Sequence, residues 1–277
     1  MPAVRTVPNL AENDRWHGID HALTAGLHDD PQAARLVEDV AAFAREHGVE
    51  LDVEGTMEVA EDLNLVFVPR SFQPAGETFD DRFRFLGPVL GTRQEDPWRP
   101  PVDDRPLVYV SLGSIFTDRP EVYRACRDAF ADGRFAVTMT VGDTDPVTLG
   151  PLPATMQVRT WSPQLTVLNR AAVFVTHAGM NSTMEALHHG VPLVAIPQMP
   201  EQVVNAERIA ELDLGRRLAP DAVTADALRT AVEEVASSGA VSAAVAAMRE
   251  DARRGGGADG AATAIEGAIE GASAPAP

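Results

Sequence analysis

The strongest constraint on the fold is a regular alternation of apolar runs and helical patterns that begins near Leu107. The runs are apolar throughout, which predicts strands that are buried on both faces, and intervening helices indicate a parallel sheet. Strands are expected at residues 106–114, 135–142, 156–161, 172–177 and 192–197, with an edge strand at 215–219. Helices are expected at residues 119–132, 162–170, 181–190, 201–213, 224–238, 240–254 and 259–270.

Polar residues gather where these strands end, which is where parallel α/β sheets bind ligands. His177 and Gly179 follow one strand, and Asn181 or Ser182 stands where a residue could cap the next helix. Glu185 comes three residues after Ser182, the spacing of a capping box. The segment therefore fits a well-capped helix. It equally fits an anion site, because a helix N-terminus offers N–H groups and partial positive charge.

The other strand ends also allow two interpretations each. The loop that ends at Ser114 is either a turn or a donor of amides and a hydroxyl, and Trp161 is either core or a face for a nucleobase. Glu201 and Gln202 either complement a helix dipole or bind the vicinal hydroxyls of a sugar. The first strand is followed by neither a dinucleotide fingerprint nor a P-loop, which argues against a dehydrogenase and a P-loop NTPase.

The run WSPQLTVLNRAAVFVTHAGMNSTMEALHHGVPLVAIPQMPEQ (161–202) resembles the signature segment of nucleotide-sugar-dependent family 1 glycosyltransferases, particularly the bacterial macrolide-type enzymes. The segments SFQP (71–74), FRFLGPVLG (83–91) and SLGS (111–114) are also similar to that family. The resemblance implies an α/β chain of the GT-B type. A doubly wound, Rossmann-like parallel sheet would bind the donor beside a remnant of a second Rossmann-like domain. It also implies a UDP-sugar co-substrate with neither cofactor nor metal.

The resemblance further implies roles for single residues. Trp161 would stack on uracil, Gln164 would lie alongside the nucleoside, and Glu185 would hold the ribose hydroxyls. Glu201 and Gln202 would bind the hexose, which favours a donor with intact hydroxyls such as UDP-glucose. The donor diphosphate would be held by Ser114, His177, Gly179, Asn181, Ser182 and Thr183.

The same resemblance divides the chain. Residues 106–254 would form the donor domain, and the mainly helical residues 1–68 would be a remnant of the acceptor domain. The proline-rich residues 69–105 would link the two, and residues 255–277 would form a helix and a disordered tail. A strand is expected at 64–68, and without neighbouring strands its edges would be exposed.

The family's general base is a histidine paired with an aspartate near the N-terminus, and no residue here matches it, so the catalytic residue is unknown. Three explanations remain open. The chain is a truncated or mis-started transferase, or one subunit of a split enzyme whose partner supplies the acceptor domain, or a non-catalytic nucleotide-sugar-binding module. The implied reaction is inverting transfer of a hexose to a hydroxyl of a hydrophobic natural product such as a macrolide.

Charge and cysteine content limit the other partners and the compartment. The formal net charge of −18 argues against binding of nucleic acid or of an anionic membrane surface. Cys126 is the single cysteine, so no internal disulfide forms, and we expect its side chain to be buried. Together with the lack of a signal-like or transmembrane-length segment, this predicts a cytoplasmic protein.

Overall fold

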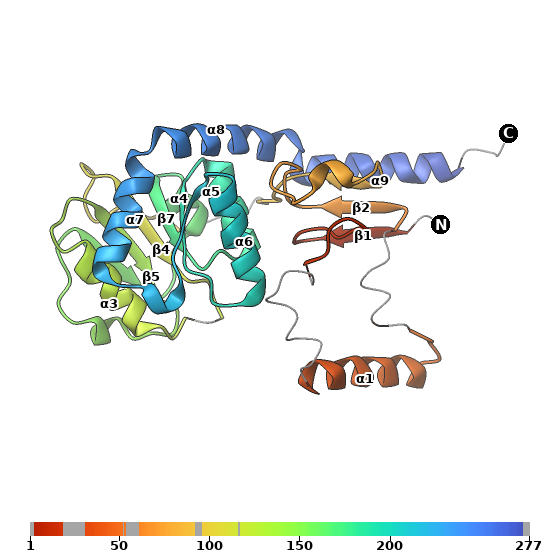
Figure 1. Cartoon of the computed structure of the whole chain (residues 1–277), viewed down its shortest axis with the longest axis horizontal. Coiled ribbons are helices and arrows are strands. Elements are labelled where there is room, and N and C mark those ends of the chain that lie inside the picture. Colours follow the sequence, from red (N-terminus) through yellow and green to blue (C-terminus); the bar gives the residue numbers. More distant parts are fainter. Residues whose placement is uncertain are drawn as a thin grey trace. The chain divides into compact units, whose positions relative to one another are not determined.

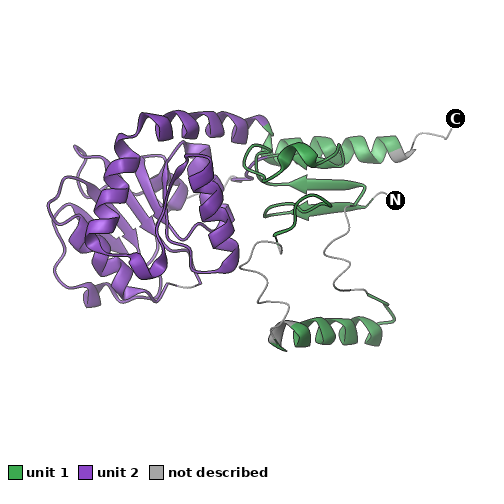
Figure 2. Ribbon diagram, in the orientation of Figure 1, with its two compact units in different colours: residues 1–86, 255–277 green, residues 87–254 purple. Residues whose placement is uncertain are grey.

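The chain folds into two compact units (Figure 2). Unit 1 comprises residues 1–86 and 255–277, and unit 2 comprises residues 87–254. These boundaries differ from the predicted ones, because residues 69–86 and the C-terminal helix both belong to unit 1. The computed structural model describes residues 3–18, 31–51, 53, 61–91, 96–115 and 117–273.

Unit 2 contains a six-stranded, entirely parallel sheet with the order β6-β5-β4-β7-β8-β9 (Figure 1). Counted from β4, this is the order 3-2-1-4-5-6 of a Rossmann fold. The predicted doubly wound parallel sheet is confirmed. The strands are β4 (Leu107–Ser111), β5 (Ala136–Thr140), β6 (Met156–Arg159), β7 (Ala171–Thr176), β8 (Leu193–Ala195) and β9 (Gly215–Arg217).

The helices of unit 2 begin and end at residues whose chemistry explains the boundary. Pro120 and Pro200 occupy the first turns of α3 and α6, where a missing N–H costs nothing. Gly190 ends α5 at φ 76°, and the Thr224 hydroxyl caps α7. Within the described residues, no helix is long and apolar enough to cross a membrane. The helices are α3 (Pro120–Ala129), α4 (Gln164–Leu168), α5 (Met180–His189), α6 (Pro200–Glu211), α7 (Ala225–Ser237) and α8 (Gly239–Arg254).

The core of unit 2 is centred on β4 and β7, as their apolar sequences require. Every residue of β4 is buried, and the rings of Tyr109 and Phe174 stack with centroids 4.9 Å apart. Removing each such side chain from water stabilises the fold by about 1.5–3 kcal/mol. Cys126 on α3 is fully buried, which confirms the prediction for this residue and raises the pKa of its thiol to about 12.

Unit 1 contains a smaller parallel sheet with the order β1-β2-β3. Its strands are β1 (Val4–Val7), β2 (Leu63–Val66) and β3 (Phe83–Phe85). The prediction of exposed edges for the strand near residue 64 is wrong, because β1 and β3 pair with β2 on both sides. The helical expectation for the N-terminal segment is confirmed at α1 (Pro31–Glu46) and wrong at β1.

The C-terminal helix α9 (Gly257–Ser273) packs on β2. Leu63, Leu65 and Leu86 form a small core against which Ile265 and neighbouring alanines of α9 are placed. The Gly257 N–H donates to the Leu86 carbonyl at 2.9 Å, which fixes the start of the helix beside the end of β3. The predicted disordered tail falls largely on residues 274–277, outside the described residues.

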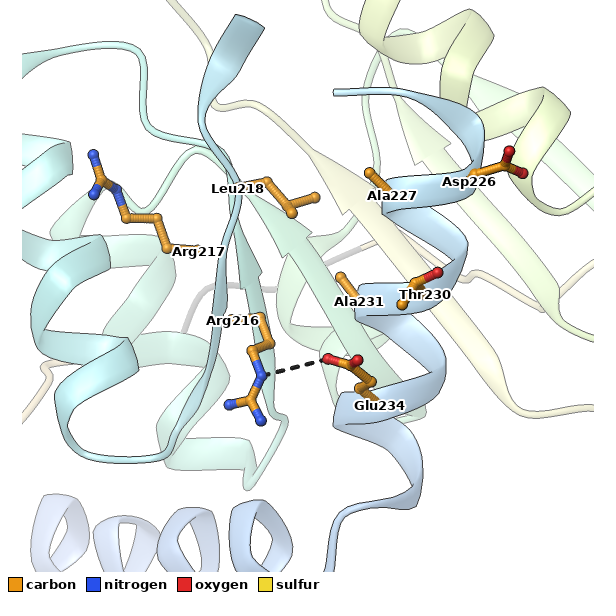
Figure 3. Close-up of a pocket in the computed structure, with 8 residues that line it drawn as sticks. All are labelled: Arg216, Arg217, Leu218, Asp226, Ala227, Thr230, Ala231 and Glu234. Atoms are coloured by element: carbon orange, nitrogen blue, oxygen red, sulfur yellow. Dashed lines mark ion pairs between the residues drawn. The ribbon is translucent and has the colours of Figure 1, made fainter. Parts of the chain in front are cut away.

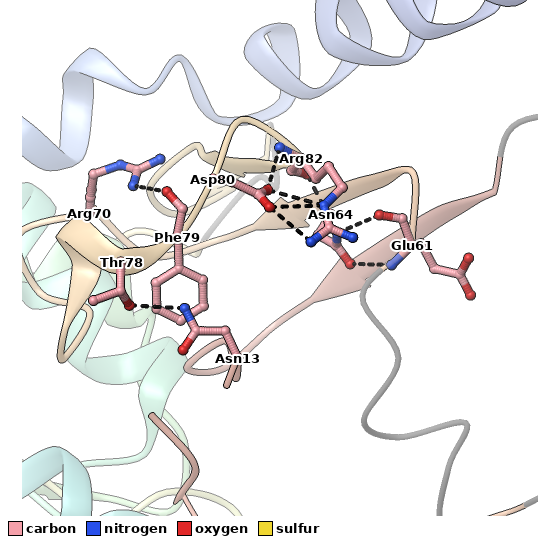
Figure 4. A network of polar contacts seen from close by, with 8 residues as sticks. All are labelled: Asn13, Glu61, Asn64, Arg70, Thr78, Phe79, Asp80 and Arg82. Atoms are coloured by element: carbon pink, nitrogen blue, oxygen red, sulfur yellow. Dashed lines mark hydrogen bonds and ion pairs between the residues drawn. The ribbon is translucent and has the colours of Figure 1, made fainter. Parts of the chain in front are cut away.

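Polar side chains complete the backbone hydrogen bonds around this small sheet (Figure 4). Asn64 is fully buried, and its Nδ2 donates to the Glu61 carbonyl at 2.9 Å. Arg82 forms a two-pronged ion pair with Asp80, which lowers the pKa of that carboxyl through its hydrogen bonds. Arg70 donates to the Phe79 carbonyl at 3.0 Å. A three-stranded sheet has few internal partners, so these contacts satisfy groups that it leaves unpaired.

Candidate functional site

Most of the predicted site residues follow the carboxyl ends of the central strands of unit 2. Ser111 at the end of β4 pairs in register with Thr176 at the end of β7. The chain leaves β4 toward β5 on one side of the sheet and leaves β7 toward β8 on the other. This change of direction is the switch point at which doubly wound sheets bind their ligands.

His177 occupies a space at this point that two glycines leave open. Gly113 has φ +89°, and a Cβ atom built on it would lie 2.8 Å from His177 Nε2. A Cβ atom on Gly179 would approach the same nitrogen even more closely. Burial of the ring lowers the pKa of His177 to about 4, so the imidazole is neutral at pH 7. A neutral imidazole can donate one N–H to an anion.

Helix α5 begins beside His177 without a side-chain cap. Gly179 is the N-cap residue, and the first N–H to return to its carbonyl is that of Thr183, at 2.9 Å. The prediction that Asn181 or Ser182 caps the helix is wrong, since both lie inside it. The amides of residues 180–182 precede the first intrahelical bond, so they are the donors that a helix offers to an anion. Thr183 is buried, and its N–H is already used.

The side chains of α4 and α5 form a hydrogen-bonded cluster around Glu185, which is 3% exposed. Gln164 Nε2 donates to Glu185 Oε2 at 2.7 Å and to Ser182 Oγ at 3.1 Å. Asn181 Nδ2 donates to Glu185 Oε1 at 3.2 Å, and Tyr109 donates to Gln164 Oε1 at 3.3 Å. Glu185 therefore belongs to no capping box, and the cluster holds its two oxygens in fixed directions.

Ser162 and Trp161 precede α4 and behave differently from each other. Ser162 does not cap this helix, because its Oγ accepts a hydrogen bond from Thr140 Oγ1 at 2.7 Å. The side chain of Trp161 is 55% exposed, so it is not a core residue and its ring presents a flat apolar surface to solvent. Ser114, after β4, is also exposed.

Glu201 and Gln202 lie in the first turn of α6, as expected, and they differ in burial. Glu201 is exposed, whereas Gln202 is 8% exposed and accepts a hydrogen bond from the Gln198 N–H through Oε1 at 2.8 Å. The Gln198 amide in turn accepts from Arg119 Nη1 at 3.4 Å. This chain of contacts links the start of α6 to the loop before α3 and orients the Gln202 amide.

Sequence reasoning missed Tyr109, Gln198 and Arg119 as parts of this arrangement. Tyr109 lies in the middle of an apolar strand, where an aromatic residue reads as core. Gln198 and Arg119 are separated by 79 residues, so no local pattern joins them. The only signal in the sequence was that Gln198 and Arg119 each lie near the start of a helix.

A separate hollow of about 370 Å³ lies between β9 and α7, away from the predicted residues (Figure 3). Both arginine side chains that line it are already paired, with Arg216 Nε 3.6 Å from Glu234 Oε2 and Arg217 Nη1 3.4 Å from Glu207 Oε1. None of the residues predicted to bind a donor lines it. The switch point at the carboxyl ends of β4 and β7 is therefore the better candidate for the functional site.

The Rossmann sheet of unit 2, with the uncapped start of α5 and the half-buried, neutral His177 at its switch point, fits a fold of the GT-B class. Solved structures agree with this fold. The calicheamicin glycosyltransferase CalG4 superposes with a TM-score of 0.83 at 35% identity, covering 99% of this chain and 71% of that one. Residues 95–245, more than half of the chain, match the family described as UDP-glucoronosyl and UDP-glucosyl transferase, and the chain belongs to that family.

Relatives with assigned names point the same way. The NDP-glycosyltransferase YjiC of Bacillus licheniformis is 41% identical over 240 residues, which are 84% of this chain and 58% of that protein. The demethyllactenocin mycarosyltransferase of Streptomyces fradiae is 40% identical over 238 residues, which are 85% of this chain and 52% of that protein. The chain thus spans about half the length of these relatives.

Proposed function

We propose that unit 2 binds a UDP-hexose and that the chain takes part in transferring the hexose to a hydroxyl of a hydrophobic natural product. The observation that carries this proposal is the uncapped start of α5 beside the neutral His177. N–H groups that are in place before the substrate binds can hold and stabilise a diphosphate without a metal ion. Membership of the UDP-glucoronosyl and UDP-glucosyl transferase family supports a UDP-sugar as the sugar donor.

In this proposal each part of the donor meets a group whose chemistry suits it. Uracil stacks on the exposed ring of Trp161, and the ribose hydroxyls donate to the fixed oxygens of Glu185. The hexose hydroxyls meet the Glu201 carboxylate and the Gln202 amide. Gln202 Oε1 accepts from the Gln198 N–H, which turns its Nε2 group toward a different acceptor. Intact hydroxyls are what these two side chains recognise, which favours glucose over a deoxygenated sugar.

The reaction step assigned to this unit is stabilisation of the leaving group. When the bond between the anomeric carbon and the diphosphate breaks, negative charge grows on the phosphate oxygens. The first amides of α5 and the His177 N–H face that charge and lower the energy of the transition state. Attack by the acceptor hydroxyl from the opposite side inverts the anomeric carbon. We assign the base for that hydroxyl to no described residue.

A second candidate is a nucleotide-sugar-binding module that does not turn over by itself, or one subunit of a split enzyme. The same donor-binding geometry at the start of α5 supports it. In that case an acceptor domain on another chain would supply the base. The two candidates differ in product formation and agree in donor binding.

Calorimetry with UDP and a product assay together test both candidates. The purified chain is titrated with UDP, then incubated with UDP-glucose or a TDP-deoxysugar and a macrolide, and the product is followed by mass. We expect UDP to bind and Trp161→Ala to weaken it at least fivefold, since stacking is worth about 1–3 kcal/mol per base. Binding with product supports the transferase, binding alone supports the module, and no binding overturns both.

A further inference from the structure

Ala178, between His177 and Gly179, has the left-handed backbone conformation that residues with a side chain avoid. Its φ is +62°, one of three such values among the described non-glycine residues. A Cβ atom in this region lies too close to a backbone carbonyl, so neighbouring contacts must hold the conformation in place. The peptide groups around Ala178 determine where Gly179 and the start of α5 lie.

Two buried side chains bind the Ala178 backbone, one at each end. Its N–H donates to Thr176 Oγ1 at 3.3 Å, and its carbonyl accepts from Asn205 Nδ2 at 3.0 Å. Thr176, Ala178 and Asn205 are each fully buried. Asn205 comes from α6, one turn after Glu201, so this bond joins the helix at the sugar end of the site to the loop at the phosphate end.

The amide oxygen of Asn205 indicates that packing alone does not explain why an asparagine occupies this position. Asn205 Oδ1 is buried and has no hydrogen-bond partner among the described residues. Burying an acceptor without a partner destabilises a fold, so a leucine of similar size would suit a purely structural position better. The bond from Nδ2 to Ala178 is the contact that an apolar residue would lose.

We propose that Asn205 is a positioning residue for the diphosphate. By holding the Ala178 carbonyl it keeps the loop in its left-handed turn, so that the Gly179 turn and the first amides of α5 face the phosphates. Asn205 itself touches no substrate in this proposal. The inference rests on the proposed function, in which this loop binds the diphosphate of a UDP-sugar.

The test compares a ligand that has phosphates with one that has none. The full chain and its variants are titrated with UDP by calorimetry and with uridine by ligand-observed NMR. Asn205→Ala should weaken UDP binding about tenfold, the usual effect of losing one buried hydrogen bond, and leave uridine binding within twofold. Adding Ala178→Gly should restore most of the UDP affinity, because glycine adopts a positive φ without strain.

A matched control and a second variant complete the design. Asn64→Ala removes an equally buried asparagine that donates to a backbone carbonyl in unit 1, and it should leave the ratio of UDP to uridine affinity unchanged. Thr176→Val removes the other bond to Ala178 with little change of shape, and it should lower the ratio as Asn205→Ala does. It answers the question even where Asn205→Ala does not fold.

The outcomes separate this inference from the function on which it rests. A wild-type chain that does not bind UDP overturns both. A wild-type chain that binds UDP, with variants that bind UDP and uridine as it does, overturns the inference alone. Equal losses of UDP and uridine affinity that Ala178→Gly does not restore also overturn it, since they mark a general loss of structure.

Discussion

Gly113 and Gly179 determine where the His177 ring lies, because a side chain on either would occupy the space of the imidazole. The two positions differ in backbone conformation. Gly113 has a positive φ, so a substitution there would be strained whatever the space, whereas Gly179 has φ −61°, which any residue adopts. Gly179 therefore allows a purely steric test of the histidine position.

Gly179→Ala should displace the His177 ring and weaken UDP binding by about tenfold or more, since it removes a charge-facing donor worth about 1.5–3 kcal/mol. Calorimetric titration with UDP measures this loss. Gly239→Ala is the matched control, because a Cβ atom on Gly239 meets nothing within 4 Å and its UDP affinity should stay at the wild-type value. Equal affinities for the two variants would show that the ring does not face the ligand.

The lowered pKa of His177 predicts a component of stability that depends on pH. Burial holds the pKa near 4 in the folded chain, against 6.5 for an unburied histidine. Below pH 6.5 the unfolded chain binds a proton that the folded chain rejects. The contribution of the neutral His177 to the free energy of unfolding is therefore complete above pH 6.5, and it is lost as the pH falls from 6.5 to about 4.

Urea unfolding at pH 7.5 and pH 4.5 measures this component when the wild type is compared with His177→Gln. We expect the wild type to lose about 2 kcal/mol more of its unfolding free energy than the variant between these two pH values. The comparison cancels the carboxylates that titrate in the same range. Parallel losses in both proteins would show that His177 is protonated freely in the folded state.

At the scale of elements, the helices of unit 2 differ in how they begin. Thr224 caps α7 with its hydroxyl, which accepts from the Ala227 N–H at 3.2 Å. Helices α5 and α6 start at Gly179 and Met199, which contribute no side-chain cap. An uncapped start leaves donors unsatisfied, so α5 and α6 retain the capacity to bind an anion or polar ligand that α7 has lost.

Thr224→Ala should lower the free energy of unfolding by about 0.5–2 kcal/mol, the usual effect of removing an N-cap. It should leave UDP affinity unchanged, because α7 lies outside the proposed site. Thermal unfolding with and without UDP checks both expectations. A loss of UDP affinity that exceeds the loss of stability would mean that α7 contributes to the site.

The elements of unit 2 were predictable because their periodicity is local and strong. Apolar runs such as the one around Tyr109 mark buried strands wherever they occur. The strand β1 was not predictable, since Val4–Val7 alternates weakly and pairs with a strand 59 residues away. The cap of α5 was mispredicted for the same reason, because Glu185 finds its partner 21 residues earlier, at Gln164. In both cases a contact between residues far apart in the sequence, and not a local pattern, determined the structure.

At the scale of the whole molecule, an acidic protein is proposed to bind an anion. The net charge of −18 repels a nucleoside diphosphate at long range, while the amides of α5 attract it only at short range. Salt screens the long-range repulsion more than the short-range attraction by the α5 amides. The affinity for UDP should therefore be constant or rise by up to about twofold between 20 and 200 mM NaCl.

Calorimetric titration with UDP across this range of salt concentration measures how the affinity depends on salt. An uncharged ligand, uridine, serves as the control and should show no trend. A steep fall of UDP affinity with salt would instead mean that arginine side chains dominate the site, as they do in proteins that bind nucleic acids.

The return of α9 to β2 means that unit 1 is discontinuous in sequence, and the chain passes between the units twice. A single proteolytic cut at one passage, near residue 87, would leave each fragment with a part of unit 1. A deletion after Arg254 would do more harm than its position suggests. It would remove the partner of Leu63 and Leu65 at the opposite end of the sequence and leave an apolar surface prone to aggregation.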